Sequence, residues 1–296
     1  MERSALSVVL LRQRLVSLLK AMPAAQAGDE ASVHLARVAS RRLREALPVL
    51  GASADERTLD RAEKRVRRLT RALGPVRELD VTLLLLAELE AKGATAPRAI
   101  ERVREKVTAE RLARRTEMLE EITPSRLNQL CKRLVKVAAP DSPMEPPADA
   151  LVEAAQQAGK RARRLRSAIE HAGSIYIADR LHRVRVAAKK LRYALEIQRE
   201  LTHSRAAARL TRLKAQQELL GRMHDLEILI DRTRAVQEAL PAGDRRGMAE
   251  LAALVRALED ECREGHACYL QARPAMLRLC DGIILATADG RPSAAA

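Results

Sequence analysis

Two stretches of the sequence place a histidine and three cations at one-turn spacing along a helix. Because an α-helix advances about 100° per residue, the four positions of each stretch fall within about 80° on one face. We call these faces the basic stripes, and they consist of His34, Arg37, Arg41 and Arg44 and of His182, Arg185, Lys189 and Arg192. Guanidinium groups bind phosphate oxygens through paired hydrogen bonds, and a histidine adds charge when protonated. The stripes therefore predict an anion site.

The two stripes belong to a longer internal repeat. Residues 33–47 align without gaps to residues 181–195, and eight of the fifteen positions are identical. A second block also recurs, in which Leu73-Gly74-x-x-Arg77-Glu78 corresponds to Leu220-Gly221-x-x-His224-Asp225. The sequence therefore predicts a duplicated unit, in which Arg77 and His224 join the candidate anion site.

Further cations extend the basic surface beyond the stripes. Arg42 and Lys190 lie off the stripes and are expected to flank them. The next helix of each half adds further candidates, which are Arg57, Arg61, Lys64, Arg68 and Arg71 in the first half and Arg205, Arg209 and Arg212 in the second. The register between these two helices stays open, because a one-residue gap must fall before Gly221.

The elements that position these residues are expected to be helices throughout. The chain has no Trp or Phe and three Tyr, and such a composition gives strands little to pack with. We predict an all-α fold with helices at about 3–21, 31–50, 55–73, 76–92, 97–122, 125–138, 148–171, 175–201, 205–220, 222–239, 245–271 and 274–287. Gly74-Pro75 and Gly221-Arg222 are interpreted as breaks between helices.

A proline-rich segment at residues 140–147 divides the chain. It holds four prolines, and no helix is expected to continue through it. We predict that half one (residues 1–139) and half two (residues 148–288) are joined by this linker into a single domain. Residues 289–296 are expected to form a disordered tail.

The net charge of +15 is concentrated in the repeated parts. Residues 31–73 carry 11 basic and 5 acidic side chains, and residues 160–214 carry 16 and 4. Most charge runs are solvated faces, and these normally alternate the two signs for i,i+4 pairing. The stripes instead stack like charges, and they do so in both halves. We therefore favour a binding function.

Composition also narrows the kind of anion. Proteins that bind single strands stack bases on aromatic rings, which are almost absent here. No helix-turn-helix or zinc-finger signature is present either. Inorganic polyphosphate, a chain of phosphates without bases, needs only the charges. The alternative function is that of a nucleic-acid-associated basic architectural protein. If the protein instead binds polyphosphate, we expect nucleic acid to be a weaker competitor for the same site.

Both repeated blocks resemble the CHAD domain, the conserved-histidine α-helical domain. Its segment His-x-x-Arg-Val-x-x-[Arg/Lys]-[Arg/Lys]-Leu-Arg matches the sequences that begin at His34 and His182. Its Leu-Gly-x-x-Arg-Asp block matches with two departures, Glu78 and His224. The resemblance covers about residues 1–288, and no stretch resembles the all-β domain often fused to this family.

This resemblance implies an architecture and a ligand. We expect a stand-alone domain of two four-helix bundles related by a pseudo-twofold axis, with a basic central channel. It implies binding of inorganic polyphosphate and association with polyphosphate granules and their proteins in the cytoplasm.

Enzyme chemistry has little support in the sequence. His224-Asp225 superficially resembles the metal ligands of HD phosphohydrolases, which would need further ligands such as His203 and Asp231. Glycines of a phosphate-cradling loop are absent. We expect no enzyme activity, and a metal-dependent phosphohydrolase is kept as the lesser alternative.

Metal and membrane sites are not expected. Cys262, His266 and Cys268 lack the second cluster that zinc sites usually need, so no metal or cofactor is predicted. No apolar run reaches the roughly 18 residues of a membrane span, and no signal peptide is evident. These features predict a cytoplasmic protein without membrane contact.

Overall fold

The computed structural model describes residues 2–51, 54–93, 96–138, 150–202 and 207–288. These residues form nine α-helices and no strand, which confirms the all-α prediction. The helices are α1 (Glu2–Ala27), α2 (Glu30–Leu50), α3 (Glu56–Ala91), α4 (Pro97–Glu121), α5 (Pro124–Ala138), α6 (Ala150–Ala172), α7 (Ala178–Thr202), α8 (Ala207–Glu238) and α9 (Arg245–Ala288). The predicted linker at 140–147 and tail at 289–296 lie outside the described residues.

Local sequence signals set several of the helix ends. Gly28 adopts a φ of +94°, a left-handed conformation that suits glycine, and it separates α1 from α2. The Asp29 carboxylate accepts a hydrogen bond of 2.7 Å from the Ser32 N–H and so caps α2. Asp55 caps α3 in the same way through the N–H of Thr58, at 2.9 Å.

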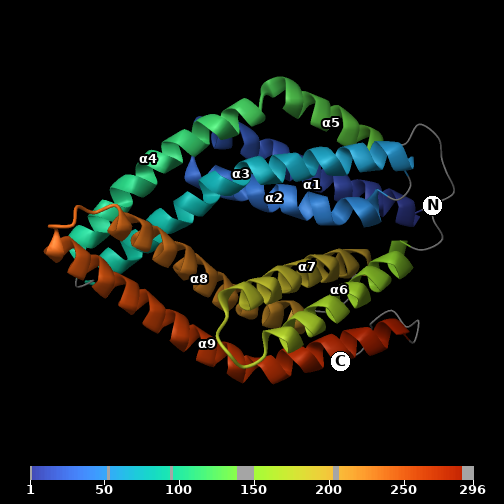
Figure 1. The fold of residues 1–296 in the computed structure, drawn as a ribbon. Coiled ribbons are helices and arrows are strands. Elements are labelled where there is room, and N and C mark those ends of the chain that lie inside the picture. Colours follow the sequence, from blue (N-terminus) through green and yellow to red (C-terminus); the bar gives the residue numbers. More distant parts are fainter. Residues whose placement is uncertain (1, 52–53, 94–95, 139–149, 203–206, 289–296) are drawn as a thin grey trace.

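Three predicted helix breaks are wrong. Helix α3 continues through Gly74-Pro75, α8 continues through Gly221, and α9 continues through Pro274. A proline inside a helix costs about 3 kcal/mol. Leu73 and Val76, on either side of Pro75, are almost fully buried, and each such side chain contributes about 1.5–3 kcal/mol. Burial therefore outweighs the local penalty, and α3 bends instead of ending (Figure 1).

Helix α1 also extends further than predicted. It was expected to end near residue 21, yet it runs to Ala27 with Pro23 inside it. Met22 and Ala25, beside this proline, are buried in the core. The same balance of burial against local propensity therefore explains this difference.

Three apolar cores hold the helices together (Figure 1). The first lies among α1, α2, the first part of α3 and α5, and the second lies among α6, α7, the first part of α8 and the last part of α9. A third core joins the two halves, because it combines the last part of α3 and α4 with the last part of α8 and the first part of α9. The duplication of the two halves stays a prediction from the sequence.

The two halves also meet near the opposite end of the molecule. Ile197 of α7 and Ala154 of α6 pack into the core of the first half. Ion pairs accompany this contact: Arg161 lies 3.1 Å from Glu45, and Arg14 lies 2.6 Å from Glu200. Between this contact and the third core, α2 runs alongside α7.

Membrane-spanning character is absent from the described helices, because none combines sufficient length with sufficient apolar character.

Candidate anion-binding site

Helices α2 and α7 bring the two basic stripes together across the middle of the molecule. The positive charges of Arg37 and Arg41 on α2 both act on Lys189 of α7. Arg41 also lies within the field of Arg192, and Arg37 within that of Arg185. We call this set the basic seam, and it comprises Arg37, Arg41, Arg44, Arg185, Lys189 and Arg192.

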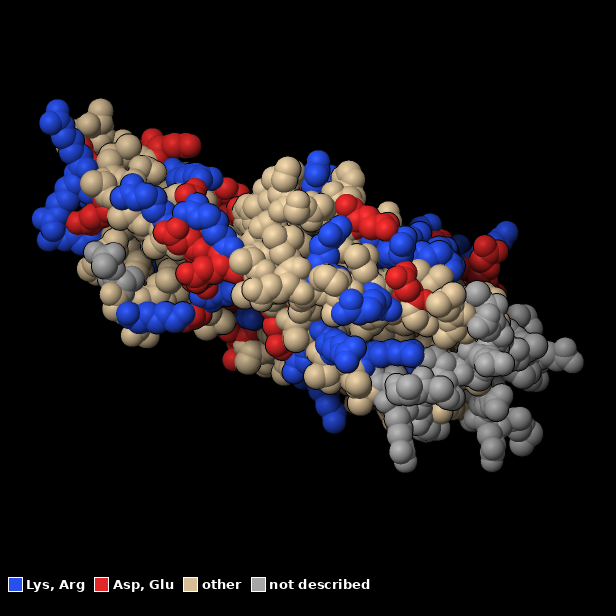
Figure 2. Space-filling model, turned by 90° about the horizontal axis from the view of Figure 1, so that it is seen from below, with Lys and Arg blue, Asp and Glu red and all other residues tan. Residues whose placement is uncertain are grey.

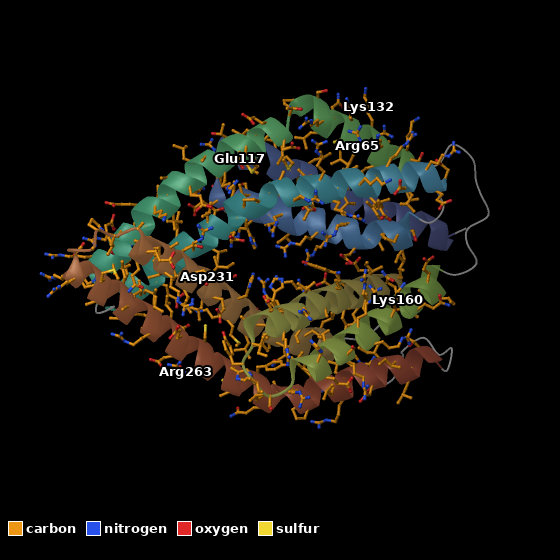
Figure 3. The ribbon with its side chains drawn as sticks, viewed as in Figure 1. Arg65, Glu117, Lys132, Lys160, Asp231 and Arg263 are labelled. Atoms are coloured by element: carbon orange, nitrogen blue, oxygen red, sulfur yellow. The ribbon has the colours of Figure 1, made fainter. Side chains whose placement is uncertain are left out.

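Side chains from both layers project into the space between these helices, and many of them end in nitrogen (Figure 3). The outer surface differs, because Lys and Arg lie beside Asp and Glu over much of the face in Figure 2. The seam is thus a place where one sign of charge is concentrated.

The cations of the seam are partly removed from water. Only 16% of the Arg185 side chain and 19% of the Arg192 side chain are exposed. Desolvation, and then the charge of Arg41, lowers the pKa of Arg37 to about 10. Desolvation, followed by the charges of Arg185 and Arg41, lowers the pKa of Lys189 to about 7. The folded protein therefore holds these charges at a cost.

Few carboxylates neutralise the positive charges of the seam. Arg185 lies 3.7 Å from Asp225, and Arg192 lies 3.4 Å from Glu196. In the described part of the chain, Arg41 and Lys189 form neither a hydrogen bond nor an ion pair, and the Nε of Arg41 is buried without a partner. An anion entering the seam would supply what these two groups lack.

Glu45, at the edge of the seam, pairs with arginines of two helices. Glu45 of α2 is buried, and its carboxylate lies 3.1 Å from both Arg44 and Arg161. Its charge is therefore divided between a seam arginine and an arginine of α6.

The two glycines of the second repeated block lie near seam arginines, and Gly74 is the more closely approached of the two. A Cβ added at Gly74 would lie 3.1 Å from the Nη1 of Arg37, and one added at Gly221 would lie 3.9 Å from the Nε of Arg185. The same Nη1 donates a hydrogen bond of 3.0 Å to the carbonyl of Thr70. Gly74 thus lets α3 approach Arg37 of α2 closely, whereas a side chain at Gly221 would make only an ordinary contact with Arg185.

The histidine of each stripe lies near the equivalent position of the second repeated block, which is Arg77 in the first half and His224 in the second. His34 is exposed, and its pKa is lowered by desolvation and by the nearby charge of Arg77. In the second half, the Nδ1 atoms of His182 and His224 lie 3.3 Å apart. Desolvation, followed by the charge of Arg185, lowers the pKa of His224 to about 4. The imidazole of His224 is therefore neutral at pH 7 in the free protein.

Three of the four acidic residues in and just after the second repeated block pair with an arginine. Glu78 pairs with Arg232 at 3.3 Å, and the buried Asp80 pairs with Arg111 at 2.6 Å. Asp225 pairs with Arg185, as described above. Glu227 instead accepts a hydrogen bond from the hydroxyl of Tyr176.

Two predicted flanking residues lie at the edges of the seam. Arg42 is 3.6 Å from Glu196 of α7. Lys190 lies in the field of Arg161, and desolvation together with that charge lowers its pKa.

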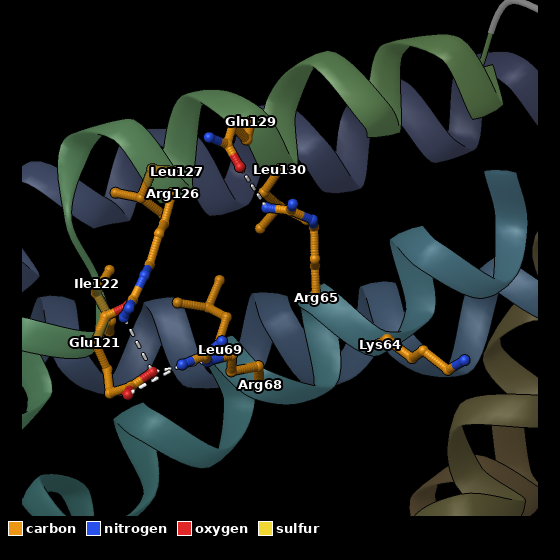
Figure 4. A pocket seen from close by; sticks show the side chains of 10 residues that line it. All are labelled: Lys64, Arg65, Arg68, Leu69, Glu121, Ile122, Arg126, Leu127, Gln129 and Leu130. Carbon is orange, nitrogen blue, oxygen red and sulfur yellow. Dashed lines mark hydrogen bonds and ion pairs between the residues drawn. The ribbon is translucent and has the colours of Figure 1, made fainter.

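Other predicted residues lie apart from the seam. Lys64 and Arg68 line a groove between α3 and α5 (Figure 4), and Arg212 lines a separate groove between α8 and α9. Arg57, Arg61 and Arg71 are exposed on α3, Arg209 is half-buried on α8, and Arg205 lies outside the described residues. Their role in anion binding stays a prediction.

Sequence inspection missed two residues of the site. The ring of Tyr193 is buried and lies 4.9 Å from the guanidinium carbon of Arg192. Arg161 shares Glu45 with Arg44. Tyr193 stands inside the repeated segment, so its position offered a signal, whereas Arg161 on α6 offered none.

Metal ligands do not gather in the described part of the chain, where no group of three or more His, Cys, Asp or Glu could hold an ion. Cys262 is buried, which raises the pKa of its thiol to about 11, and Cys268 is exposed. His203 lies outside the described residues.

Comparison with known proteins identifies the family. A CHAD domain model matches residues 9–234, and the chain therefore belongs to the CHAD domain family. The solved structure described as PptA from Streptomyces chartreusis matches with a TM-score of 0.69 at 17% identity, covering 91% of this chain and 98% of that one. No curated protein matches the sequence.

A second solved structure, the CHAD domain from the plant Ricinus communis, matches with a TM-score of 0.58 at 23% identity and covers 96% of this chain and 91% of that one. At such identities the two likenesses concern the fold. They agree with the predicted all-helical architecture.

Proposed function

We propose that this protein binds inorganic polyphosphate in the basic seam, and that the seam forms the wall of a basic channel. One observation carries the proposal: cations of two helices face each other, and Arg41 and Lys189 have no partner in the described part of the chain. Phosphate oxygens accept hydrogen bonds from guanidinium and ammonium groups and supply the missing negative charge. Binding therefore relieves the repulsion within the seam.

A chain of phosphates suits this site better than a nucleic acid. Stacking of bases needs exposed aromatic rings, and of the three tyrosines Tyr193 and Tyr269 are buried while Tyr176 is half-buried. The seam lies between two helices in contact, which suits a single flexible chain better than a duplex. Nucleic acid stays the second candidate because its phosphates carry the same charge.

The protein is proposed to act by binding alone, without bond cleavage. We further propose a cytoplasmic location at polyphosphate granules, where granule proteins would be its neighbours. Turnover of polyphosphate with added Mg²⁺ or Mn²⁺ would instead favour the metal-dependent phosphohydrolase.

Calorimetric titration with polyphosphates of graded length tests the proposal. Replacing Arg41 and Lys189 by Gln removes two charged donors and is expected to weaken binding about 100-fold or more. The matched control replaces Arg246 and Arg263 by Gln, since both are exposed and paired within their own helix, with Glu250 and Asp260. The control should bind within about threefold of the parent.

Two results would contradict the proposal. One is equal affinity of the seam variant and the control variant for long polyphosphate. The other is competition in which duplex or single-stranded DNA displaces polyphosphate easily while the reverse displacement fails.

A further inference from the structure

A second basic groove lies on the outside of the first half. It runs between α3 and α5, has a volume of about 330 Å³, and is floored by the apolar side chains of Leu69, Ile122 and Leu130. Basic side chains stand on both walls (Figure 4). We call the basic set the outer track. It comprises Lys64, Arg65 and Arg68 of α3 and Arg126 of α5, which line the groove, together with Arg57 and Arg61, which are exposed further along α3.

Positive charge exceeds negative charge along this groove. Its lining contains the cations Lys64, Arg65, Arg68 and Arg126 and one carboxylate, that of Glu121. Arg65 donates a hydrogen bond of 2.9 Å to the uncharged amide of Gln129. With Arg57 at its end, the α3 part of the outer track is about 17 Å long at 1.5 Å per residue. A surface that only needed solubility would carry both signs in closer balance.

Arginines of the groove already bind one anionic group, the carboxylate of Glu121. The Nε and Nη2 of Arg68, on one wall, lie 2.8 and 3.2 Å from its two oxygens. Arg126, on the other wall, places its Nη1 3.3 Å from the same carboxylate. Arginines of two helices thus converge on one anionic group in a geometry that also suits phosphate.

The outer track is separate from the basic seam. Its charged groups form ion pairs and hydrogen bonds with Asp60 of α3, Glu121 of α4 and Gln129 of α5. The seam lies between α2 and α7 instead. One phosphate chain in the seam would therefore leave the outer track unoccupied.

From this separation we infer that the outer track is a second polyphosphate site, so that one protein molecule joins two polyphosphate chains. The inference rests on the proposed function of the seam for its ligand class. A molecule with two sites links long chains into a network, because each chain can also hold several proteins. The protein would then condense polyphosphate in addition to binding it.

Calorimetry with a short polyphosphate and light scattering with a long one test this inference. The parent protein should bind two equivalents of the short chain and become turbid with the long one. Replacing Arg65 and Arg68 by Gln should reduce the stoichiometry to one and abolish turbidity. The Arg246→Gln, Arg263→Gln control should behave as the parent does.

A substitution in the opposite direction strengthens the test. Glu121→Gln removes the carboxylate that competes for Arg68 and Arg126, and it should raise the affinity of the second equivalent about threefold. A folding defect would not produce tighter binding. Weaker or unchanged binding of the second equivalent by this variant would overturn the inference.

Failure of this inference differs from failure of the proposed function. One equivalent in the parent, with unchanged scattering after the Arg65→Gln, Arg68→Gln exchange, overturns the outer site and leaves the seam intact. Binding that survives the Arg41→Gln, Lys189→Gln exchange but disappears after the outer exchange overturns the seam and supports the outer site.

Discussion

Lys189 shows most directly what the crowding of like charges does to a single residue. Three arginines act on its ammonium group, Arg185, Arg41 and Arg37, and only Asp225 opposes them. Its pKa falls from the usual 10.5 to about 7 as a result. Between these two values the unfolded chain holds a proton that the folded chain lacks, so the stability of the free protein rises with pH through this window.

Binding of polyphosphate should reverse this deprotonation. A bound phosphate favours the charged lysine, so the protein is expected to take up about one proton at pH 8 and to lose affinity as the pH rises further. Calorimetry in two buffers of different ionisation enthalpy measures that proton. Lys189→Arg keeps the charge at all these pH values, and proton uptake as large in this variant as in the parent would exclude Lys189 as its source.

Gly74 and Gly221 offer a matched pair of substitutions. In a helix interior, Ala is favoured over Gly by about 1 kcal/mol. A Cβ at Gly221 meets only an ordinary contact at 3.9 Å, whereas one at Gly74 approaches the tethered Arg37 to 3.1 Å. Gly221→Ala should therefore stabilise the protein in urea unfolding, while Gly74→Ala should gain less and weaken polyphosphate binding. Identical behaviour of the two variants would contradict this reasoning.

At the scale of the helices, the sequence predicts where most helices lie, but it does not predict which helices continue through a proline or glycine. The positions of α2, α4 and α5 follow from apolar spacing and from caps such as Asp29. Continuation through Pro75 and Pro274 depends on burial by distant helices, which local rules do not contain. The same limit applies to the cations: the stripe of α2 is visible in the sequence, but the packing of α5 against α3 decides that Arg68 faces an outer groove.

Helices α2 and α7 should contribute equally to the binding of long chains. Replacing Arg37 and Arg41 by Gln on α2 removes as many seam charges as replacing Arg185 and Lys189 by Gln on α7. We expect losses of affinity that agree within about threefold, given the usual spread of such contributions. If calorimetry shows that one of the two exchanges leaves the affinity unchanged, the anion is bound by a single helix and not by both.

At the scale of the whole molecule, the seam is a source of instability that the ligand removes. Charge repulsion opposes compaction, and a ligand that binds only the folded state stabilises it by about 2.7 kcal/mol at a hundredfold excess over Kd. Polyphosphate should raise the Tm by several degrees, and chloride at equal ionic strength should do much less. The Arg41→Gln, Lys189→Gln variant should melt higher than the parent when free and should respond less to polyphosphate. A lower Tm would indicate that these residues stabilise the free fold.

Salt dependence measures how many of the six seam cations act together. Each neutralised phosphate contributes about 0.7–0.9 to the slope of log affinity against log salt on nucleic acids, so six contacts would give a slope of roughly 4 or more. Titrations over a range of NaCl concentrations provide this slope. A slope below about 2 would mean that only one or two phosphates are engaged.

The third apolar core has a consequence for how the chain is made. Its side chains come from both halves, with Leu86 and Ile100 from the first and Leu229 and Leu251 from the second. During synthesis the amino-terminal half therefore emerges with an apolar surface that nothing covers until α8 and α9 leave the ribosome. We therefore expect the two halves to fold together, and we expect the nascent first half to aggregate more readily than the complete chain.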